Sequence, residues 1–382
     1  MPPPDPVRIL DADRHVVEPV GLWREYLPRE LRVHAPYLEP ASAPLGPGSA
    51  MPRSPSLMLA GEPVMHKLSE RARGELMKAN YRRALELREG TSPDGQLRAM
   101  DRTGIDVAVL YPTYASYVIG VDFIEPELGA ALARAYNDWL HDFCAPDRAR
   151  LLGMGLISLH DPARAAAEVE RVAGRGWRGV VLRPNPVYGR TLGDPAYEPF
   201  WAACVHHALV VAVHEGTHAR QPTAGADRFH SRFALHACSH PMELMMAFLA
   251  LYEGGVLERH PGLRVAFLEA GCGWVPYWLW RLDEEYRHLA GELDRQVSAA
   301  PSVVFQRQCF VGFEPGEPYL DDVVARLGSD KLLFGSDFPH VDHDDDLVAQ
   351  ARRLGERLPE PALRALLWEN SARFYGLVSS SR

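Results

Sequence analysis

Short, almost wholly apolar runs recur along the chain, and stretches with the spacing of an amphipathic helix separate them. The apolar runs cover residues 7–15, 106–112, 150–159, 179–184, 209–215, 263–271, 303–313 and 331–337. Runs such as VAVLY at 107–111 are typical of parallel strands that are covered on both faces. The pattern therefore predicts an α/β protein whose eight strands alternate with helices.

Several of the expected helices begin with proline in the first turn, as helix N-termini often do. These helices cover residues 93–104, 126–145, 162–175, 195–207, 242–259, 275–293 and 319–327. Repeated strand and helix units favour a closed (β/α)8 TIM barrel. An open doubly wound sheet is the rival, but no glycine-rich phosphate loop follows the first run. A last helix over 361–374 is expected to close the barrel bottom or to pack alongside it.

One segment, residues 19–92, does not fit the repeat. It holds a proline-rich stretch over 36–63 and a charged, helix-like stretch over 68–87. An insertion after the first strand reaches the face where a barrel keeps its chemistry, so it is expected to act as a lid or an oligomer contact. A surface excursion without functional contact is the alternative. The 382 residues are otherwise expected to form one metal-dependent TIM-barrel domain, 1–382.

Composition narrows the possible partners and the compartment. The net charge of −9, with no basic stripe, argues against nucleic acid and anionic membranes as partners. No apolar run approaches the roughly 20 residues of a membrane helix. The five cysteines are odd in number and scattered, which is typical of reduced thiols and predicts a cytoplasmic protein.

Polar side chains stand where the apolar runs end. They are Asp13, His15, Tyr111, Thr113, Arg183, Asn185, His214, Glu215, Glu269, Glu314, Asp337 and His340. In a barrel these positions share the catalytic face, and imidazole nitrogens with carboxylate oxygens are what a divalent metal needs. The first and last runs, more than three hundred residues apart, thus predict one shared metal site. Asp11 has the same strand parity as Asp13, so either carboxylate could be the structural one.

Three motifs carry a family resemblance that spans nearly the whole chain. They are DADRHVVEP at 11–19, HPGLRV at 260–265 leading into LEAG at 268–271, and GSDFPH at 335–340. Together with His214 they resemble the amidohydrolase superfamily, in particular its aminocarboxymuconate-semialdehyde decarboxylase-like branch. The resemblance implies one divalent ion, Zn²⁺ or Mn²⁺, held by Asp13, His15, His214 and Asp337. It also implies a homodimer.

The same resemblance suggests roles around the metal. Glu269, Asp337 and His214 are the candidate catalytic groups, although decarboxylases of this branch carry histidine where this chain has Glu269. Arg183, His340 and His218 are the candidate substrate-binding residues, with Arg183 as a clamp for a carboxylate. Each has a structural alternative: a hydrogen-bonded core histidine, a helix-capping aspartate, or a carboxylate and an arginine joined in a salt bridge.

Three functions follow in order of preference. The first is a non-oxidative decarboxylase, a metal-dependent lyase acting on a small aromatic or unsaturated cyclic carboxylic acid. The second is a metal-dependent hydrolase of an amide, lactone or related carbonyl, which the missing strand-six histidine keeps open. The third is a non-catalytic barrel that only binds a ligand.

Overall fold

A computed structural model describes residues 7–39, 56–65, 69–215, 220, 222–293, 297–340 and 346–377. Its centre is a set of buried parallel strands. They are β1 (Leu10–His15), β5 (Val107–Tyr111), β6 (Leu151–Gly153), β7 (Gly155–Leu156), β8 (Gly179–Leu182), β9 (Val210–His214), β10 (Val265–Leu268), β11 (Cys309–Phe313) and β12 (Leu332–Phe334). Nearly every residue of these strands is buried, as expected when helices cover the outside of a barrel and side chains fill its interior.

The strands close into the predicted barrel. β1, β5 and β6 pair in one run, and β7 through β12 pair in sequence order in another. β6 and β7 are two halves of one strand that bends at Met154, whose N–H donates to the Leu110 carbonyl at 3.1 Å. On the other side, the N–H groups of Ser336 and Asp337 donate to the Asp13 carbonyl at 3.1 and 2.9 Å. The described chain therefore contributes eight parallel strands to one ring.

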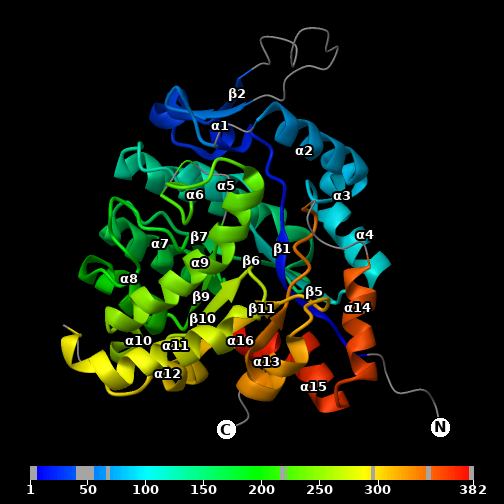
Figure 1. Ribbon diagram of the computed structural model, residues 1–382. Coiled ribbons are helices and arrows are strands. Elements are labelled where there is room, and N and C mark those ends of the chain that lie inside the picture. The colour runs from blue at the N-terminus through cyan, green and yellow to red at the C-terminus, as the bar shows by residue number, and fades with distance from the viewer. Residues whose placement is uncertain are drawn as a thin grey trace.

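Helices surround the ring (Figure 1). They are α4 (Pro93–Thr103), α5 (Tyr114–Ile119), α6 (Pro126–Phe143), α7 (Pro162–Gly174), α8 (Glu198–His206), α9 (Arg232–Glu253), α10 (Val256–Arg259), α11 (Trp274–Leu289), α12 (Pro301–Gln308), α13 (Leu320–Leu327), α14 (Leu347–Arg353), α15 (Glu360–Arg364) and α16 (Asn370–Phe374). Several begin as their sequences predict: the Ser92 hydroxyl caps α4, and the Asp161 carboxylate caps α7. No helix in the described part of the chain is both long and apolar enough to cross a bilayer.

The C-terminal helices pack alongside the ring, which was one of the two predicted arrangements. α16 lies against β1 and β12, and the Tyr375 hydroxyl just beyond it donates to the Ala12 carbonyl at 3.1 Å. The same hydroxyl pairs with that of Tyr111 on β5 at 2.8 Å. Tyr375 is 1 % exposed, so these bonds anchor the chain end inside the barrel wall.

The segment between β1 and α4 forms a small layer of its own. It comprises α1 (Leu22–Tyr26), an antiparallel sheet of β2 (Tyr37–Glu39), β3 (Ser56–Leu59) and β4 (Glu62–Pro63), then α2 (Glu70–Arg82) and α3 (Ala84–Glu89). In Figure 1 α1, β2 and α2 lie at the top, whereas α13 and α15 lie at the bottom. The Arg220 N–H donates to the Val64 carbonyl at 2.8 Å, and the Val17 N–H to the Gly90 carbonyl at 3.0 Å. The layer therefore touches the chain beyond the carboxyl ends of β9 and β1.

Two predicted elements were wrong in their extent. Residues 303–308 were predicted as strand, but they belong to helix α12, and only Cys309–Phe313 form β11. The apolar run VVF at 303–305 misled the prediction, because Val303 is 55 % exposed on the outer side of that helix while Val304 and Phe305 are buried. The helix predicted from residue 242 begins at Arg232 and runs through Pro241. Proline is unfavourable inside a helix, but the packing of α9 against the barrel keeps the helix continuous through Pro241.

Candidate metal and proton-transfer site

The first strand carries an irregularity that separates its acidic residues. The pairing register of β1 with β5 shifts between Asp11 and Arg14. The Asp11 carboxylate accepts from the Ser336 N–H at 2.9 Å and from the Ser336 hydroxyl at 2.6 Å. Asp13 instead lies beside His15 and His214. The bulge therefore gives Asp11 a hydrogen-bonded place in the wall, and Asp13 is the one that joins the imidazoles.

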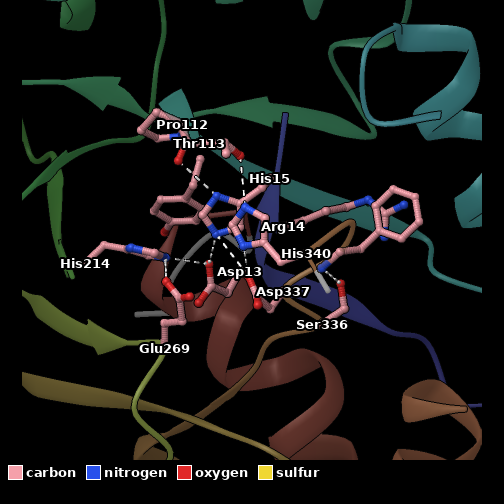
Figure 2. A network of polar contacts seen from close by, with 12 residues as sticks. Asp13, Arg14, His15, Pro112, Thr113, His214, Glu269, Ser336, Asp337 and His340 are labelled. Atoms are coloured by element: carbon pink, nitrogen blue, oxygen red, sulfur yellow. Dashed lines mark hydrogen bonds and ion pairs between the residues drawn. The ribbon is translucent and has the colours of Figure 1, made fainter. Parts of the chain in front are cut away.

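The imidazoles of β1 and β9 converge on the Asp13 carboxylate (Figure 2). His15 Nε2 lies 3.4 Å from Asp13 Oδ1, and His214 Nε2 lies 3.3 Å from the same oxygen. The two rings are 4.9 Å apart between centroids. These three residues offer one ligand atom each, all within 4.8 Å of one another, so they can surround a single ion.

The other nitrogen of each ring is held by the backbone. His15 Nδ1 donates to the Pro112 carbonyl at 3.0 Å, and His214 Nδ1 donates to the Glu215 carbonyl at 2.9 Å. Such bonds orient each ring so that Nε2 is directed at the cluster, where it becomes a potential ligand once it has lost its proton. His15 Nε2, His214 Nε2 and Asp13 Oδ1 are buried without a hydrogen-bond partner in the described residues. Buried polar atoms without partners are costly, and a divalent cation would satisfy all three, so the residues fit a metal.

Asp337, just beyond β12, joins the cluster through His15. Its Oδ1 lies 3.3 Å from His15 Nε2 and accepts from His340 Nδ1 at 2.6 Å. His15, Asp337 and His340 form a second group of potential ligands, which shares His15 with the first. His340 Nε2 in turn pairs with the Thr113 hydroxyl at 3.0 Å. The structure thus brings all four predicted ligands together and adds His340 beside them.

Glu269, beyond β10, stands between the cluster and a second polar layer. Its Oε2 lies 3.1 Å from His214 Nε2, and its Oε1 lies 3.5 Å from Nε2 of His240 on α9. His240 Nδ1 lies 3.6 Å from Glu215, whose other oxygen is 3.8 Å from Arg183 Nη2. Where the decarboxylase-like branch carries a strand-six histidine, this chain therefore has a carboxylate with a helix-borne imidazole beside it.

Burial and neighbouring charges shift the pKa values of His214, Asp13 and Glu269. Burial alone would lower the pKa of His214, but the Asp13 and Glu269 carboxylates raise it to about 9. Burial would raise the pKa of Asp13, but His214 and His15 hold it below its ordinary value. Burial, followed by the Asp337 charge, raises the pKa of Glu269 well above its usual range. Glu269 therefore keeps a proton more readily than an ordinary solvent-exposed glutamate does.

A small cavity opens beside the cluster. Asp13, Glu269 and Asp337 line it together with Gly271, Gly312, Phe313, Glu314, Gly335, Ser336 and Leu347. A larger cleft of about 650 Å³ lies elsewhere, lined by Arg8, Asp106 and Arg352, and contains none of the predicted site residues. The smaller cavity is the candidate active site, because Asp13, a potential metal ligand, and Glu269, whose pKa is raised, both line it.

The predicted substrate-binding residues have different outcomes. Arg183 is 5 % exposed; its Nη1 donates to the Ser116 carbonyl at 3.2 Å. That environment matches the salt-bridged alternative, and its role as a carboxylate clamp stays a prediction. His340 belongs to the cluster. His218 lies outside the described residues.

Glu18 is a supporting residue that sequence reasoning left without a role. Its buried carboxylate accepts from the N–H groups of Thr113, Tyr114 and Ala115 at 3.1, 2.9 and 3.0 Å. It thereby fixes the start of α5 and the threonine that holds His340. The only available signal was the glutamate of the 11–19 motif, and nothing in the linear pattern indicates a partner about a hundred residues away.

Fold and site together define the class of protein. The Amidohydrolase family model matches residues 11–377, so the chain belongs to this family. Two curated relatives agree with the decarboxylase-like branch. Gamma-resorcylate decarboxylase from Rhodococcus jostii is 27 % identical over 294 residues, covering 68 % of this chain and 83 % of the relative. The 2-amino-3-carboxymuconate-6-semialdehyde decarboxylase of Dictyostelium discoideum is 24 % identical over 292 residues, covering 75 % and 77 %.

A solved structure supports the same fold over almost the entire chain. It is 5-carboxyvanillate decarboxylase from Novosphingobium aromaticivorans, complexed with manganese and 4-hydroxy-3-methoxy-5-nitrobenzoic acid. The TM-score is 0.70 at 19 % identity, and the match covers 97 % of this chain and 96 % of that one. The predicted barrel and the predicted branch are thus both confirmed.

Proposed function

We propose that the protein is a metal-dependent, non-oxidative decarboxylase of a small aromatic or unsaturated cyclic carboxylic acid. The proposal rests on three buried ligand atoms, one each on Asp13, His15 and His214, which converge on one point and have no hydrogen-bond partner within the described residues. Asp337 is the proposed fourth ligand, 3.3 Å from His15 Nε2. The relatives named above are decarboxylases, and the solved relative was complexed with manganese and a nitrobenzoic acid. Mn²⁺ and Zn²⁺ both suit two imidazoles and two carboxylates.

The chemistry divides between the cation and the protein. A bound divalent cation supplies Lewis acidity and positive charge opposite a substrate carboxylate. The overall reaction consumes one proton: the ring carbon gains hydrogen, the carbon–carbon bond to the carboxyl group breaks, and carbon dioxide leaves. Glu269 is the proposed proton carrier, because its carboxyl lines the cavity and lies next to His214. His340 hydrogen bonds to Asp337 and so holds that carboxylate in place.

Substrate orientation is proposed for three basic side chains. His340 and Arg183 are the proposed contacts for the polar groups of the acid, with His218 as a third. Arg183 would have to release part of its interaction with Glu215, 3.8 Å away, to bind a carboxylate in a bidentate manner. Its burial supports a strong charge interaction with a substrate that enters a dry site.

The remaining assignments concern the whole chain. Residues 19–92 are proposed as a lid within a single catalytic domain, supported by the hydrogen bonds of Val64 and Gly90 to Arg220 and Val17, which follow the carboxyl ends of β9 and β1. A homodimer is proposed because α11 exposes Tyr277 and Trp280 by 59 % and 56 %, and large aromatic side chains are enriched at interfaces. Five free cysteines support a cytoplasmic location.

The proposal is tested by loading the purified chain with Mn²⁺ or Zn²⁺ and supplying a panel of hydroxybenzoates and muconate-like acids. We expect about one ion per chain by elemental analysis, and carbon dioxide released in proportion to acid consumed. Consumption of esters, lactones or amides without gas evolution would reject the lyase in favour of the hydrolase. A chain that stays metal-free after incubation with either ion would count against both enzymes. A metallated chain that binds these acids but turns over neither class would indicate the ligand-binding barrel.

A further inference from the structure

Beneath the cluster, buried polar side chains join the first and last strands of the barrel. Asp11 uses both carboxylate oxygens on one residue: Oδ1 accepts from the Ser336 N–H and Oδ2 from the Ser336 hydroxyl. The Ser336 hydroxyl also accepts from the Phe338 N–H at 3.2 Å. Asp337 lies between these two residues, so Asp11 holds the turn that carries the proposed fourth ligand.

Arg14 closes the same network from the other side. Its Nη1 lies 3.4 Å from Asp11 Oδ2, and its guanidinium stacks 3.8 Å from the centroid of the Phe338 ring. Its Nε donates to Gln96 Oε1 at 2.6 Å, and Gln96 Nε2 donates to the His15 carbonyl at 2.7 Å. Arg14 thereby compensates the buried Asp11 charge and links the backbone of His15 to the ring of Phe338. Figure 2 shows Arg14 and Ser336 directed away from the imidazoles.

The turn that this network holds is strained. Asp337 has φ 50, a left-handed conformation that residues other than glycine rarely adopt. Its N–H donates to the Asp13 carbonyl, and the Phe338 carbonyl accepts from the His15 N–H at 2.7 Å. The residues on either side of Asp337 are therefore tied to the two ligand-bearing residues of β1, and the backbone of Asp337 cannot relax without breaking these bonds.

We propose that Asp11, acting through Ser336, is a positioning residue that sets the Asp337 carboxylate opposite Asp13 and His15. This inference rests on the proposed function, because it takes those three residues as ligands of one ion. Asp11 does not belong to either group of converging ligand atoms in the described residues, and both of its oxygens instead accept hydrogen bonds from Ser336. We expect loss of the Asp11 to Ser336 interaction to act mainly on the strand-eight carboxylate, because Ser336 directly precedes Asp337 and the imidazole of His15 is held separately by the Pro112 carbonyl.

The test is Mn²⁺ affinity, measured by titration calorimetry on metal-stripped protein well below its melting temperature. Ser336→Ala removes the hydroxyl that bonds to Asp11 and Phe338. We expect Mn²⁺ binding about 10–100-fold weaker, the range for residues that orient metal ligands. Ser336→Thr keeps a hydroxyl and is expected to restore affinity to within a few-fold of the original chain. Ser371→Ala is the matched control, since that buried hydroxyl has no hydrogen-bond partner in the described residues.

A second variant guards against misfolding. Asp11→Asn keeps the shape of the side chain but removes its charge, and is expected to weaken Mn²⁺ binding in the same direction as Ser336→Ala. The inference is overturned if both variants fold and bind Mn²⁺ with unchanged affinity. It is also overturned if Ser371→Ala loses as much affinity as Ser336→Ala, or if the original chain binds no metal. If the original chain binds Mn²⁺ but releases no carbon dioxide, the proposed reaction fails while a selective loss in the variants still supports the positioning role.

Discussion

Two acidic residues of the site, Glu269 and Asp337, have a backbone conformation that residues other than glycine rarely adopt. Glu269 has φ 61 and Asp337 has φ 50, both in the left-handed region. Each follows the end of a strand, β10 or β12, where the chain must turn sharply to aim a side chain back over the barrel. Strain of this kind concentrates at functional sites because only surrounding contacts hold it. The unfavourable backbone conformation of these two residues thus lowers local stability but directs their carboxylates toward His15 and His214.

The proton role of Glu269 is testable by one substitution. Glu269→Gln keeps size but cannot carry a proton between atoms, so we expect kcat for decarboxylation to fall about 10²–10⁴-fold. Steady-state kinetics and calorimetry should find KM and Mn²⁺ affinity changed far less. Glu198→Gln is a suitable control, because Glu198 pairs with Arg259 and His260 away from the site. Unchanged kcat in Glu269→Gln would remove this residue from the mechanism.

The cysteines provide a test of burial. Burial raises the pKa of Cys144 to about 12, and it also raises the pKa of Cys204, Cys272 and Cys309. Because the thiolate is the reactive form, we expect these four to resist alkylation between pH 7 and 9, whereas half-buried Cys238 reacts. Native protein should therefore take up about one label per chain by mass spectrometry, and unfolded protein should take up all five. Rapid native labelling of more than one thiol would contradict the packing.

At the scale of elements, the sequence predicted strands better than helix boundaries. Strands such as β5 and β9 are apolar on both faces, so composition alone marks them. α12 was missed because three consecutive apolar residues, 303–305, look like a strand in the sequence. The predicted α9 was too short because proline, here Pro241, is unfavourable inside an isolated helix. The β1 bulge was equally invisible: strand parity grouped Asp11 with Asp13, and only the register with β5 separates them.

The close approach of β12 to β1 gives a prediction for these two elements. A Cβ added at Gly335 would lie 2.6 Å from the Asp13 Cβ, too close for the strands to keep their spacing. We expect Gly335→Ala to cost about 1–3 kcal/mol in the free energy of unfolding, and to weaken Mn²⁺ binding by displacing Asp13. Gly312→Ala on β11 is the control, because its Cβ would come no nearer than 3.4 Å to Leu268. Denaturant titration of both variants makes the comparison, and equal costs would refute the explanation.

At the scale of the molecule, the candidate site was predictable because barrel topology brings all strand ends to one face. Asp13, His15, His214 and Asp337 were identified from that rule together with the family resemblance, and the structure brings them together. Partners such as Glu18 and Gln96 depend on side-chain packing between distant segments, which no linear pattern records. The place of His240 beside Glu269 was not predictable from the sequence, because it depends on where α9 begins and how that helix packs.

Metal removal is expected to lower the stability of the whole fold. The cluster leaves three buried ligand atoms unsatisfied, so an ion that binds only the folded state stabilises it by about 2.7 kcal/mol at a hundred times its Kd. Thermal unfolding should therefore show a Tm several degrees lower after chelation, restored by Mn²⁺ or Zn²⁺ and not by Mg²⁺, which prefers oxygen ligands. A Tm that ignores both chelator and added ion would argue that these atoms bind no metal.

The seam between β1 and β12 has a consequence for biosynthesis. A growing chain makes Asp13 and His15 more than three hundred residues before Ser336 and Asp337, so the carbonyl of Asp13 receives the N–H groups of those two residues only after they have been synthesised. Until then the outer edge of the first strand stays open, and one wall of the ion site is missing. Binding of the cation by all four proposed ligands therefore requires that both strands have been synthesised, and a chain that lacks Ser336 and Asp337 is expected to form neither a closed ring nor a complete set of ligands.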